Sequence, residues 1–530
     1  MNALPPSLRK VLQARGYTTS EGIDRLLQPP LDLPSFTVPD MGKAVERLRA
    51  IIQAEDAVAI YADRDVDGLS GMAILARTLK TLGARVHWGS PLHGRGLERA
   101  VLERLVQSGA KVMILVDCGT GEAVELAWLA AQGIDVIIAD HHRVQSEIPV
   151  AWAWIHPGMT VKEHSESPCG TVMAFKLAEA LWRTFIDPAD PERLHYFLYD
   201  HLDLVALGIL ADRVPLVGEN RMLVWHGLRR LANTRKEGLA ALLRFFRIKG
   251  NPVTVRQATW QIIPLLNAAG RLGQPEQAAN LLLTEDSWAA RECIDALLGL
   301  NTARRRAQEA SVLQFEKTVL EQCAVDKDLV LVATARDLEP AVTGLAAQSL
   351  VQKYGRPAFL FVEQGDDLVG SGRGTPDVDL FQWIEKHQDL LLKFGGHQGA
   401  VGLTVRKSDF PALREGLLKS AIEKDAGPDL QGRQAEAEAH LDEAGPEWWE
   451  SLQSLEPFGQ GFEIPAFELT HIEGVMPRSK RSPTKVMLKR GDFSWPAELP
   501  ASAQVPKRIV AIPQATPKEE FPFKWLIQPQ

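Results

Sequence analysis

Cysteine is scarce in this chain of 530 residues, and long apolar runs are missing. The four cysteines lie far apart and form no C-x-x-C pair, a spacing that fits neither a zinc knuckle nor a disulfide scaffold, so we expect free thiols. No apolar run reaches the roughly 18 residues that a membrane span requires. The opening residues, MNALPPSLRK, carry no apolar stretch behind their positive charges and predict no secretory signal. The sequence therefore predicts a cytoplasmic protein.

A net positive charge is also absent. The formal net charge is −8 at pH 7, which argues against a protein that coats nucleic acid non-specifically, because such proteins usually have a basic surface. A nuclease remains compatible with this charge, since an acidic metal site can lie inside a locally basic channel. Apolar residues make up 45% and charged residues 24% of the chain, as in ordinary globular proteins. The length suits three or four domains of roughly 150 residues each.

Between residues 57 and 160 the chain alternates short apolar runs with helical stretches. The helical stretches are 70–82, 96–108 and 121–132. The apolar runs are Ala57–Tyr61, Arg85–Trp88, Val112–Val116, Asp135–Ala139 and a run around Ala151–Ile155. Strands that alternate with helices of about 10–15 residues predict βαβ units and a parallel sheet, so the predicted fold class is α/β.

The remaining chain predicts further domains. Residues 170–325 have a mostly helical pattern with one strand-like run at Leu204–Leu210, and their last part favours a long connecting helix or helical pair. A second α/β pattern starts at Leu329–Ala333, and short alternating runs follow residue 465. We predict an N-terminal helical segment (1–50), a parallel-sheet domain (51–275), connecting helices (276–325), a smaller α/β domain (326–426) and a C-terminal β domain (427–530).

Acidic and histidine side chains follow three of the predicted strands directly. In an open parallel sheet, ligands bind beyond the carboxyl ends of the strands, and these ends share one edge. Alternation along an extended strand end would also put every second residue after the first strand on the same side. The residues at this edge are Asp63, Asp65 and Asp67 after the first strand, Asp117 after the third, and Asp140, His141 and His142 after the fourth.

Carboxylates this close cannot all ionise unless cations neutralise them. Carboxylates with imidazoles suit manganese, and a carboxylate-rich site also accepts magnesium. Two such ions about 3.5–4 Å apart are the arrangement that hydrolyses phosphoesters. A single aspartate after a strand is usually a helix cap or a turn residue, but seven acidic and histidine side chains at one edge favour a metal site. For Asp212, which follows the run Leu204–Ala211, both interpretations stay open.

These residues resemble a known family. The elements Asp63–Gly68, Asp117–Gly119, Asp140–His142 and Ala206–Leu216 are similar, in order and spacing, to the four motifs of the DHH phosphoesterases. Similarity to the RecJ-like exonucleases, which are specific for single-stranded DNA, covers most of the chain. It includes Pro168–Val172, Asn267–Gly273, Gly370–Arg373, Phe394–His397 and Leu455–Gly461. The resemblance implies a DHH domain, a smaller α/β DHHA1 domain joined to it by a long helix, and a C-terminal OB-like β domain.

The resemblance also implies roles for individual residues. Two Mn2+ or Mg2+ ions would be held by Asp63, Asp65, Asp67, Asp117, His141 and Asp212, with Asp117 as the bridge. His142 would lie beside the reacting phosphate, and Asp140 would orient a histidine without binding a metal ion itself. Substrate would be bound in the second domain by Ser371, Arg373, Gly395, Gly396 and His397, of which Arg373 and His397 would grip phosphate oxygens.

For nucleic-acid contacts the residues leave alternatives open. A basic stretch in the tail, Arg478–Arg490, is either a solvated face or a DNA contact, and the OB-like resemblance favours DNA. Arg304–Arg306 are either a second contact or a helix surface.

The activity that the resemblance implies is that of a metal-dependent exonuclease, 5′ to 3′ on single-stranded DNA, in DNA repair and recombination. A helicase and a single-strand-binding protein are natural partners, and we expect a monomer. Two alternatives remain: another DHH phosphoesterase that acts on short oligonucleotides, and a non-catalytic DNA-binding scaffold. The residues after 427 disfavour the first alternative, and the filled ligand positions disfavour the second.

Overall fold

The structure is a computed structural model. It describes residues 4–31, 33, 38–92, 96–144, 149–159, 167–250, 252–325, 327–336, 338, 340–375, 378–397, 399–423, 434–477, 485–490, 493–499, 509–516 and 523–527; for Ala307, Gln308, Ser311, Ala341, His397, Pro477 and Phe493 the backbone alone is described. The chain divides into two compact units. The first unit comprises Met1–Thr302 with Ala444–Pro465, and the second comprises Ala303–Glu443 with Ala466–Gln530.

The first unit is built on a parallel sheet with the strand order β2-β1-β3-β4-β5. Its strands are β1 (Ala57–Ala62), β2 (Arg85–Gly89), β3 (Val112–Val116), β4 (Asp135–Ala139) and β5 (Ala153–Ile155), and its crossover helices are α4 (Val66–Thr81), α5 (Arg99–Gln107) and α6 (Ala123–Ala131). The α/β class and the five predicted strands are confirmed. Three helices precede the sheet, α1 (Pro6–Ala14), α2 (Ser20–Leu27) and α3 (Met41–Gln53), and η1 (Pro157–Met159) follows it.

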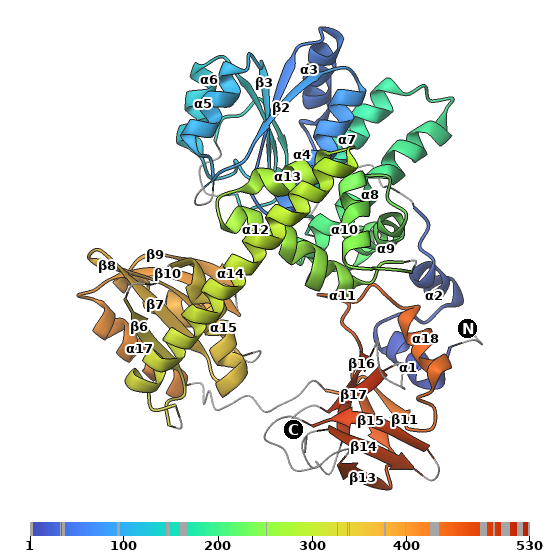
Figure 1. Ribbon diagram of the computed structural model, residues 1–530, viewed down its shortest axis with the longest axis vertical. Helices are drawn as coiled ribbons and strands as arrows, with labels where there is room; N and C mark the ends of the chain where they lie inside the picture. The colour runs from blue at the N-terminus through green and yellow to red at the C-terminus, as the bar shows by residue number, and fades with distance from the viewer. Residues whose placement is uncertain are drawn as a thin grey trace. The chain divides into compact units, whose positions relative to one another are not determined.

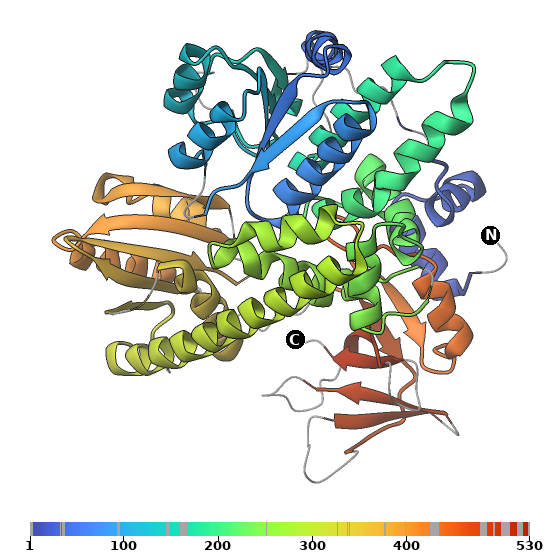
Figure 2. The ribbon, with the colours of Figure 1, turned by 45° about the horizontal axis from the view of Figure 1, so that its top comes forward.

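Both faces of this sheet are buried, as continuous apolar strands require. Along β1, Val58, Ile60 and Ala62 pack into the core that contains α4 and α7 (Gly170–Phe185). Ala59 and Tyr61, which point the other way, pack into the core that contains α5 and α6. Figure 1 and Figure 2 show these helices on opposite sides of the sheet. The carboxyl edge of the strands is therefore held from both faces.

The rest of the first unit is helical. Its helices are α8 (Pro191–Asp212), α9 (Gly218–Ala232), α10 (Glu237–Phe245), α11 (Val255–Gln257), the π-turn η2 (Ala258–Ile262), α12 (Ile263–Arg271), α13 (Pro275–Leu283) and α18 (Pro446–Gln453). The prediction of a strand-like run at Leu204–Leu210 was wrong, because these residues lie inside α8. That run is buried between α4, α7 and α9, and a short apolar run that is covered on all sides has the same pattern in a helix as in a strand.

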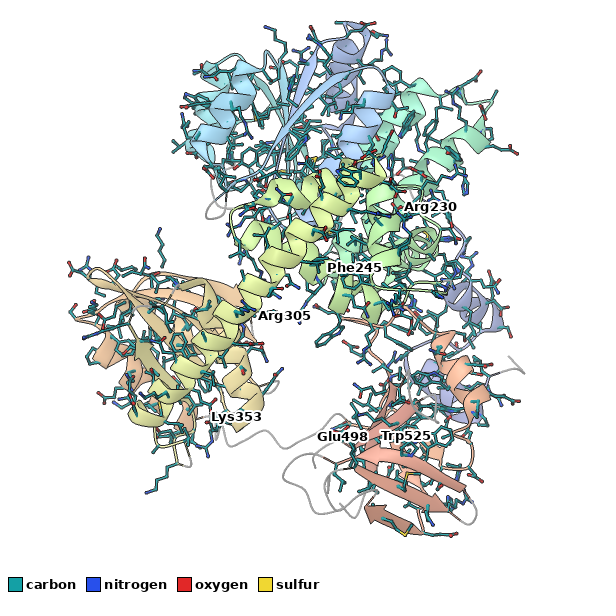
Figure 3. All side chains as sticks on the ribbon, viewed as in Figure 1. Arg230, Phe245, Arg305, Lys353, Glu498 and Trp525 are labelled. Atoms are coloured by element: carbon teal, nitrogen blue, oxygen red, sulfur yellow. The ribbon has the colours of Figure 1, made fainter. Side chains whose placement is uncertain are left out.

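Buried ion pairs fasten α8 to the helices that follow it. Arg230 of α9, labelled in Figure 3, donates a hydrogen bond to the carboxylate of Asp200 in α8. Lys236, just before α10, lies 2.9 Å from Oδ1 of Asp203, which is fully buried in α8. Paired charges of this kind tolerate burial, whereas an unpaired one would not. They fix the helix whose last residue is Asp212.

The long connecting helix is confirmed as α14 (Ser287–Gln322), whose 36 residues span about 54 Å at the ordinary rise per residue. In the second unit, β6 (Leu331–Ala335) pairs in parallel with β7 (Ala358–Gln364), and β8 (Asp367–Arg373), β10 (Ala400–Arg406) and β9 (Leu391–His397) follow antiparallel. The accompanying helices are η3 (Pro340–Val342), α15 (Thr343–Tyr354), α16 (Leu380–Glu385), η4 (Gln388–Leu390) and α17 (Phe410–Glu423). This is the predicted smaller α/β sheet.

The C-terminal β sheet is also confirmed, with the order β11-β12-β16-β17-β15-β14-β13. Its strands are β11 (Ala437–His440), β12 (Phe467–Thr470), β13 (Gly474–Pro477), β14 (Lys485–Arg490), β15 (Phe493–Glu498), β16 (Ile509–Ala515) and β17 (Phe523–Ile527). Trp525, labelled in Figure 3, is buried edge-to-face against Phe467 and Phe523 and forms its core. Among the described residues, no helix has the length and apolarity needed to cross a bilayer.

Candidate metal centre

The loop after β1 supplies three aspartates, but not along an extended strand. The chain turns into α4 at Val66, where Asp65 caps the helix by accepting hydrogen bonds from the backbone N–H of Asp67 and Gly68. Gly68 is required there, since a Cβ would lie 2.4 Å from the carbonyl oxygen of Asp63. The prediction that strand alternation aligns all three aspartates was therefore wrong in its geometry, because Asp67 lies in the first turn of α4.

Asp67 is held by the start of another helix. Its two carboxylate oxygens accept hydrogen bonds of 2.8 Å from the backbone N–H of Gly170 and of Thr171, at the N-terminus of α7. The helix N-terminus carries a partial positive charge, which stabilises this buried carboxylate. Asp67 is thus fixed with a carboxylate oxygen 3.8 Å from Nε2 of His141.

Asp117, after β3, adopts a left-handed backbone conformation with φ of 60°, which a residue other than glycine adopts only where its surroundings hold it. Its backbone N–H donates to the carbonyl of Ala139 at the end of β4. Gly170 packs so closely that an added Cβ would lie 2.5 Å from the Asp117 Cβ. The side chain is buried, and its Oδ1 accepts no hydrogen bond from any described residue.

After β4, Asp140 is the fixed point of the triplet. Its Oδ1 accepts from the backbone N–H of His141 at 2.7 Å and lies 2.8 Å from Nδ1 of His142, while Oδ2 accepts from the hydroxyl of Thr120. With its oxygens occupied in this way, Asp140 orients His142.

His156 takes part in this site, and sequence reasoning missed it. Its Nε2 donates to the carbonyl oxygen of His142 at 2.8 Å, and its Nδ1 accepts from the backbone N–H of Gly158. His156 directly follows β5, so the rule that selects residues after strands would have found it.

His141 lies at the centre of the cluster. Its Nε2 is 3.1 Å from Oδ1 of Asp117 and 3.7 Å from Oδ2 of Asp212, the last residue of α8. Asp212 therefore belongs to the cluster, as the ligand interpretation requires. Three groups have ligand atoms within 4.8 Å of one another: Asp63 with Asp65 and Asp117; Asp67 with His141 and Asp212; and Asp117 with Asp140, His141 and His142.

The electrostatics of the cluster favour bound cations. Burial, together with the carboxylates of Asp67 and Asp63, raises the pKa of Asp65 to about 7. Burial and the charge of Asp67 likewise raise the pKa of Asp212 to about 7. The pKa of Asp117 is raised well above its ordinary value by burial and by the same neighbours. Divalent cations would remove this repulsion and would bind Oδ1 of Asp117, which accepts no hydrogen bond from the described residues, so the donor set fits them.

The pKa values of the two histidines in the triplet are shifted in opposite directions. The hydrogen bond to Asp140 raises the pKa of His142 to about 9, whereas burial lowers the pKa of His141. Burial also acts to raise the pKa of Asp140, but the hydrogen bonds from His142 and Thr120 outweigh it and hold that pKa well below its ordinary range. His142 is thus a cation at neutral pH, whereas His141 is a neutral imidazole whose unprotonated nitrogen can bind a metal ion.

The predicted substrate residues come together in the second unit. On β10, which lies between β8 and β9, Ala400 pairs with Arg373 of β8 on one side and with His397 of β9 on the other. Gly402 pairs in the same way with Ser371 and Gly395. Two strand spacings, about 10 Å, therefore separate the outer positions.

The side chains on β8 have defined neighbours. The hydroxyl of Ser371 lies 2.8 Å from that of Thr343, and Arg373 donates to the carbonyl of Gly372. Gly396 has a φ of 140° and passes so close to Ala400 that a Cβ would lie 2.3 Å from its carbonyl oxygen. The side chain of His397 lies outside the described residues.

Comparisons with known proteins place this geometry in a family. The DHH family model, for its N-terminal domain, matches residues 57–209, and the DHHA1 domain model matches residues 327–424. The chain is 31% identical to the single-stranded-DNA-specific exonuclease RecJ of Bacillus subtilis over 79% of its own length, but it spans only 52% of that protein. It is 30% identical to RecJ of Dickeya dadantii, covering 88% of this chain and 84% of that protein.

The folds agree as well. The crystal structure of RecJ from Thermus thermophilus in complex with Mn2+ matches 99% of this chain and 78% of that one, with a TM-score of 0.79 and 26% identity. Because the chain is 30% identical to RecJ of Dickeya dadantii over more than four fifths of that protein's length, it belongs to the RecJ family of single-stranded-DNA-specific exonucleases.

Proposed function

We propose that this chain is a metal-dependent exonuclease that hydrolyses phosphodiester bonds of single-stranded DNA, from the 5′ end, in DNA repair and recombination. The observation that carries the proposal is the convergence of Asp67, Asp117 and Asp212 on Nε2 of His141 at one edge of the sheet. Membership of the RecJ family supports the substrate class and the polarity. The chain spans about half the length of its Bacillus subtilis relative.

The metal ligands that we propose divide between two positions. Asp63 and Asp65 lie at one, and Asp67, His141 and Asp212 at the other, with Asp117 between them because it is close to both groups. Bound Mn2+ or Mg2+ would activate water and neutralise the negative charge on the phosphate.

The chain's own residues would orient the substrate and stabilise its charge. The imidazolium of His142 has 58% of its side chain exposed, so it can donate a hydrogen bond to a phosphate oxygen at the site. Asp140, through its hydrogen bond to Nδ1, would keep that ring protonated and aimed. In the second unit we assign phosphate binding to Ser371, Arg373, Gly395, Gly396 and His397, in which arginine supplies a two-pronged donor and the glycines give access to backbone N–H groups.

We also propose that the C-terminal sheet contributes to DNA binding. Lys485 and Lys489 lie on β14, and Arg490 pairs with Asp442, whereas Arg478, Lys480 and Arg481 lie outside the described residues. Arg305, labelled in Figure 3, is exposed on α14. The domain boundaries, a monomeric state, recruitment by a helicase or a single-strand-binding protein, and action in the cytoplasm remain parts of this proposal.

Digestion of end-labelled substrates tests the activity. With Mn2+ present, we expect a 5′-labelled single strand to release labelled mononucleotide at once, and a 3′-labelled strand to shorten progressively. A blunt duplex should persist. Activity confined to dinucleotides would favour a phosphoesterase of short oligonucleotides, and binding without hydrolysis would favour a scaffold; either result would contradict the proposal.

Added Mn2+ should stabilise the protein strongly at pH 8 and hardly at pH 5. The raised pKa values of Asp65 and Asp212, about 7, mean that their charges repel fully above pH 7 and that protonation removes this cost below it. At a hundred times the dissociation constant, binding adds about 2.7 kcal/mol, which corresponds to a rise of roughly 2–4 °C in melting temperature. Thermal melts with and without Mn2+ measure this rise, and an equal rise at both pH values would contradict the metal assignment.

A further inference from the structure

An exposed tryptophan lies on a widened helical turn near the metal centre. Residues 255–271 form one continuous helical segment, α11, η2 and α12, which begins at a capping box between Thr254 and Gln257. Within it, the N–H of Ile263 donates to the carbonyl of Ala258, five residues back. Such π-turns are rare in proteins, and those that do occur lie frequently at functional sites.

Pro264 explains this turn. In an ordinary helix, residue 264 would donate its N–H to the carbonyl of Trp260, but proline has no N–H and its ring presses against that carbonyl. The helix relaxes by widening over Ala258–Ile262, and Trp260 lies in the middle of the widened turn.

Trp260 is 75% exposed, the highest value for any aromatic side chain among the described residues. Other tryptophans of this chain, such as Trp383 and Trp448, are almost completely buried. An indole left in water forgoes the free energy of its burial, so its exposed face is available to a ligand. Arg256, one turn earlier on the same helix, is exposed as well.

The other end of the same segment is attached to the metal loop. Asn267, seven residues after Trp260, accepts a hydrogen bond of 2.9 Å from the backbone N–H of Val66, which lies between Asp65 and Asp67. Gly270 packs so closely that a Cβ would lie 2.2 Å from the carbonyl oxygen of Arg64. Helix α12 also contacts α4 directly (Figure 1). Seven residues of helix correspond to about 10 Å along its axis.

We propose that Trp260 and Arg256 form a platform for the single strand beyond the scissile phosphate. The indole of Trp260 stacks on one unpaired base, and the guanidinium of Arg256 pairs with a backbone phosphate. Aromatic faces interleaved with basic side chains are the usual surface for single strands, and they accept any sequence because each base has a π-face. A base inside a duplex is already stacked, so the platform also disfavours double strands. The inference rests on the proposed function for its substrate class.

Variants at this platform should separate long substrates from short ones. For a 20-nucleotide single strand, we expect Trp260→Ala to raise KM about tenfold, and Arg256→Ala several-fold, with little change in kcat. Trp260→Phe should keep most of the affinity because it retains an aromatic face. A 5′-phosphorylated dinucleotide, too short to reach the platform, should be hydrolysed equally by all of them. Trp288→Ala, which removes another exposed indole, on α14, is the matched control and should leave both substrates unaffected.

A binding measurement keeps this test separate from the test of the proposed function. Anisotropy of a labelled 20-nucleotide strand, measured with EDTA, should show about tenfold weaker binding by Trp260→Ala whether or not the protein hydrolyses DNA. A series of strands, each lacking one base at a different position, locates the stacked base. The wild type should bind one strand of the series more weakly than the others, whereas Trp260→Ala should bind all of them equally. Unchanged binding in Trp260→Ala would overturn the platform and leave the indole to a protein partner. A wild type that binds but hydrolyses nothing would overturn the proposed function alone.

Discussion

Replacing Asp117 with asparagine should lower kcat on single-stranded DNA by at least about a thousandfold, a loss of ~4 kcal/mol in transition-state stabilisation. Asp117 shares one group of ligand atoms with Asp63 and Asp65, and its Oδ1 lies 3.1 Å from Nε2 of His141, so its loss affects both proposed metal positions. Asparagine is the appropriate replacement because it tolerates the left-handed backbone at this position. Single-turnover hydrolysis with saturating Mn2+ measures the loss.

The same variant should be at least as stable as the wild type when metal is absent. Burial and the neighbouring carboxylates raise the pKa of Asp117, so above that pKa its charge costs folding free energy, and asparagine removes the charge. Thermal melts in EDTA at pH 8 measure this. Asp135→Asn is a matched control, since Asp135 starts β4 at the opposite edge of the sheet and pairs with Arg47. The control should stay within about twofold of wild-type activity, and a similar loss in both variants would contradict the metal assignment.

The sequence predicted which residues converge better than it predicted how they converge. Strand ends can be located from short apolar runs, and parallel strands place their ends at one edge, so the places of Asp117 and Asp140 followed directly. The position of Asp67 did not, because it depends on backbone N–H groups of Gly170 and Thr171, more than one hundred residues away. No local sequence pattern around Asp67 predicts that contact.

Helical context accounts for the other differences. The run Leu204–Leu210 is apolar on all sides because α8 passes through the middle of the unit, which removes the amphipathic pattern that would identify a helix. The exposure of Trp260 was not predicted either, since an aromatic residue in a helical pattern is usually a core residue. The widened turn that contains Trp260 was not predicted for a related reason, since the effect of Pro264 on that turn is visible only once the helix is known to continue through the proline.

Replacing Asp140 with asparagine should make the activity sensitive to pH in a specific way. The hydrogen bond to Asp140 raises the pKa of His142 to about 9, so the wild-type imidazolium persists up to about pH 9. Without that carboxylate, the pKa should return to about 6.5, at which roughly 3% of the ring is protonated at pH 8. We therefore expect a loss of kcat of about thirtyfold at pH 8 but only about 1.3-fold at pH 6. The pH dependence of kcat between pH 5.5 and 9 measures it.

His142→Gln supplies the control for this interpretation, because it removes the charge at every pH. Its loss of kcat should be at least as large as that of Asp140→Asn at pH 8, and it should not recover at pH 6. If Asp140→Asn loses the same factor at both pH values, Asp140 acts through its hydrogen bonds to Thr120 and His141 and supports the loop. Recovery at pH 6 in that variant alone means that the carboxylate acts by keeping the proton on His142, since only the charge of the ring changes between the two conditions.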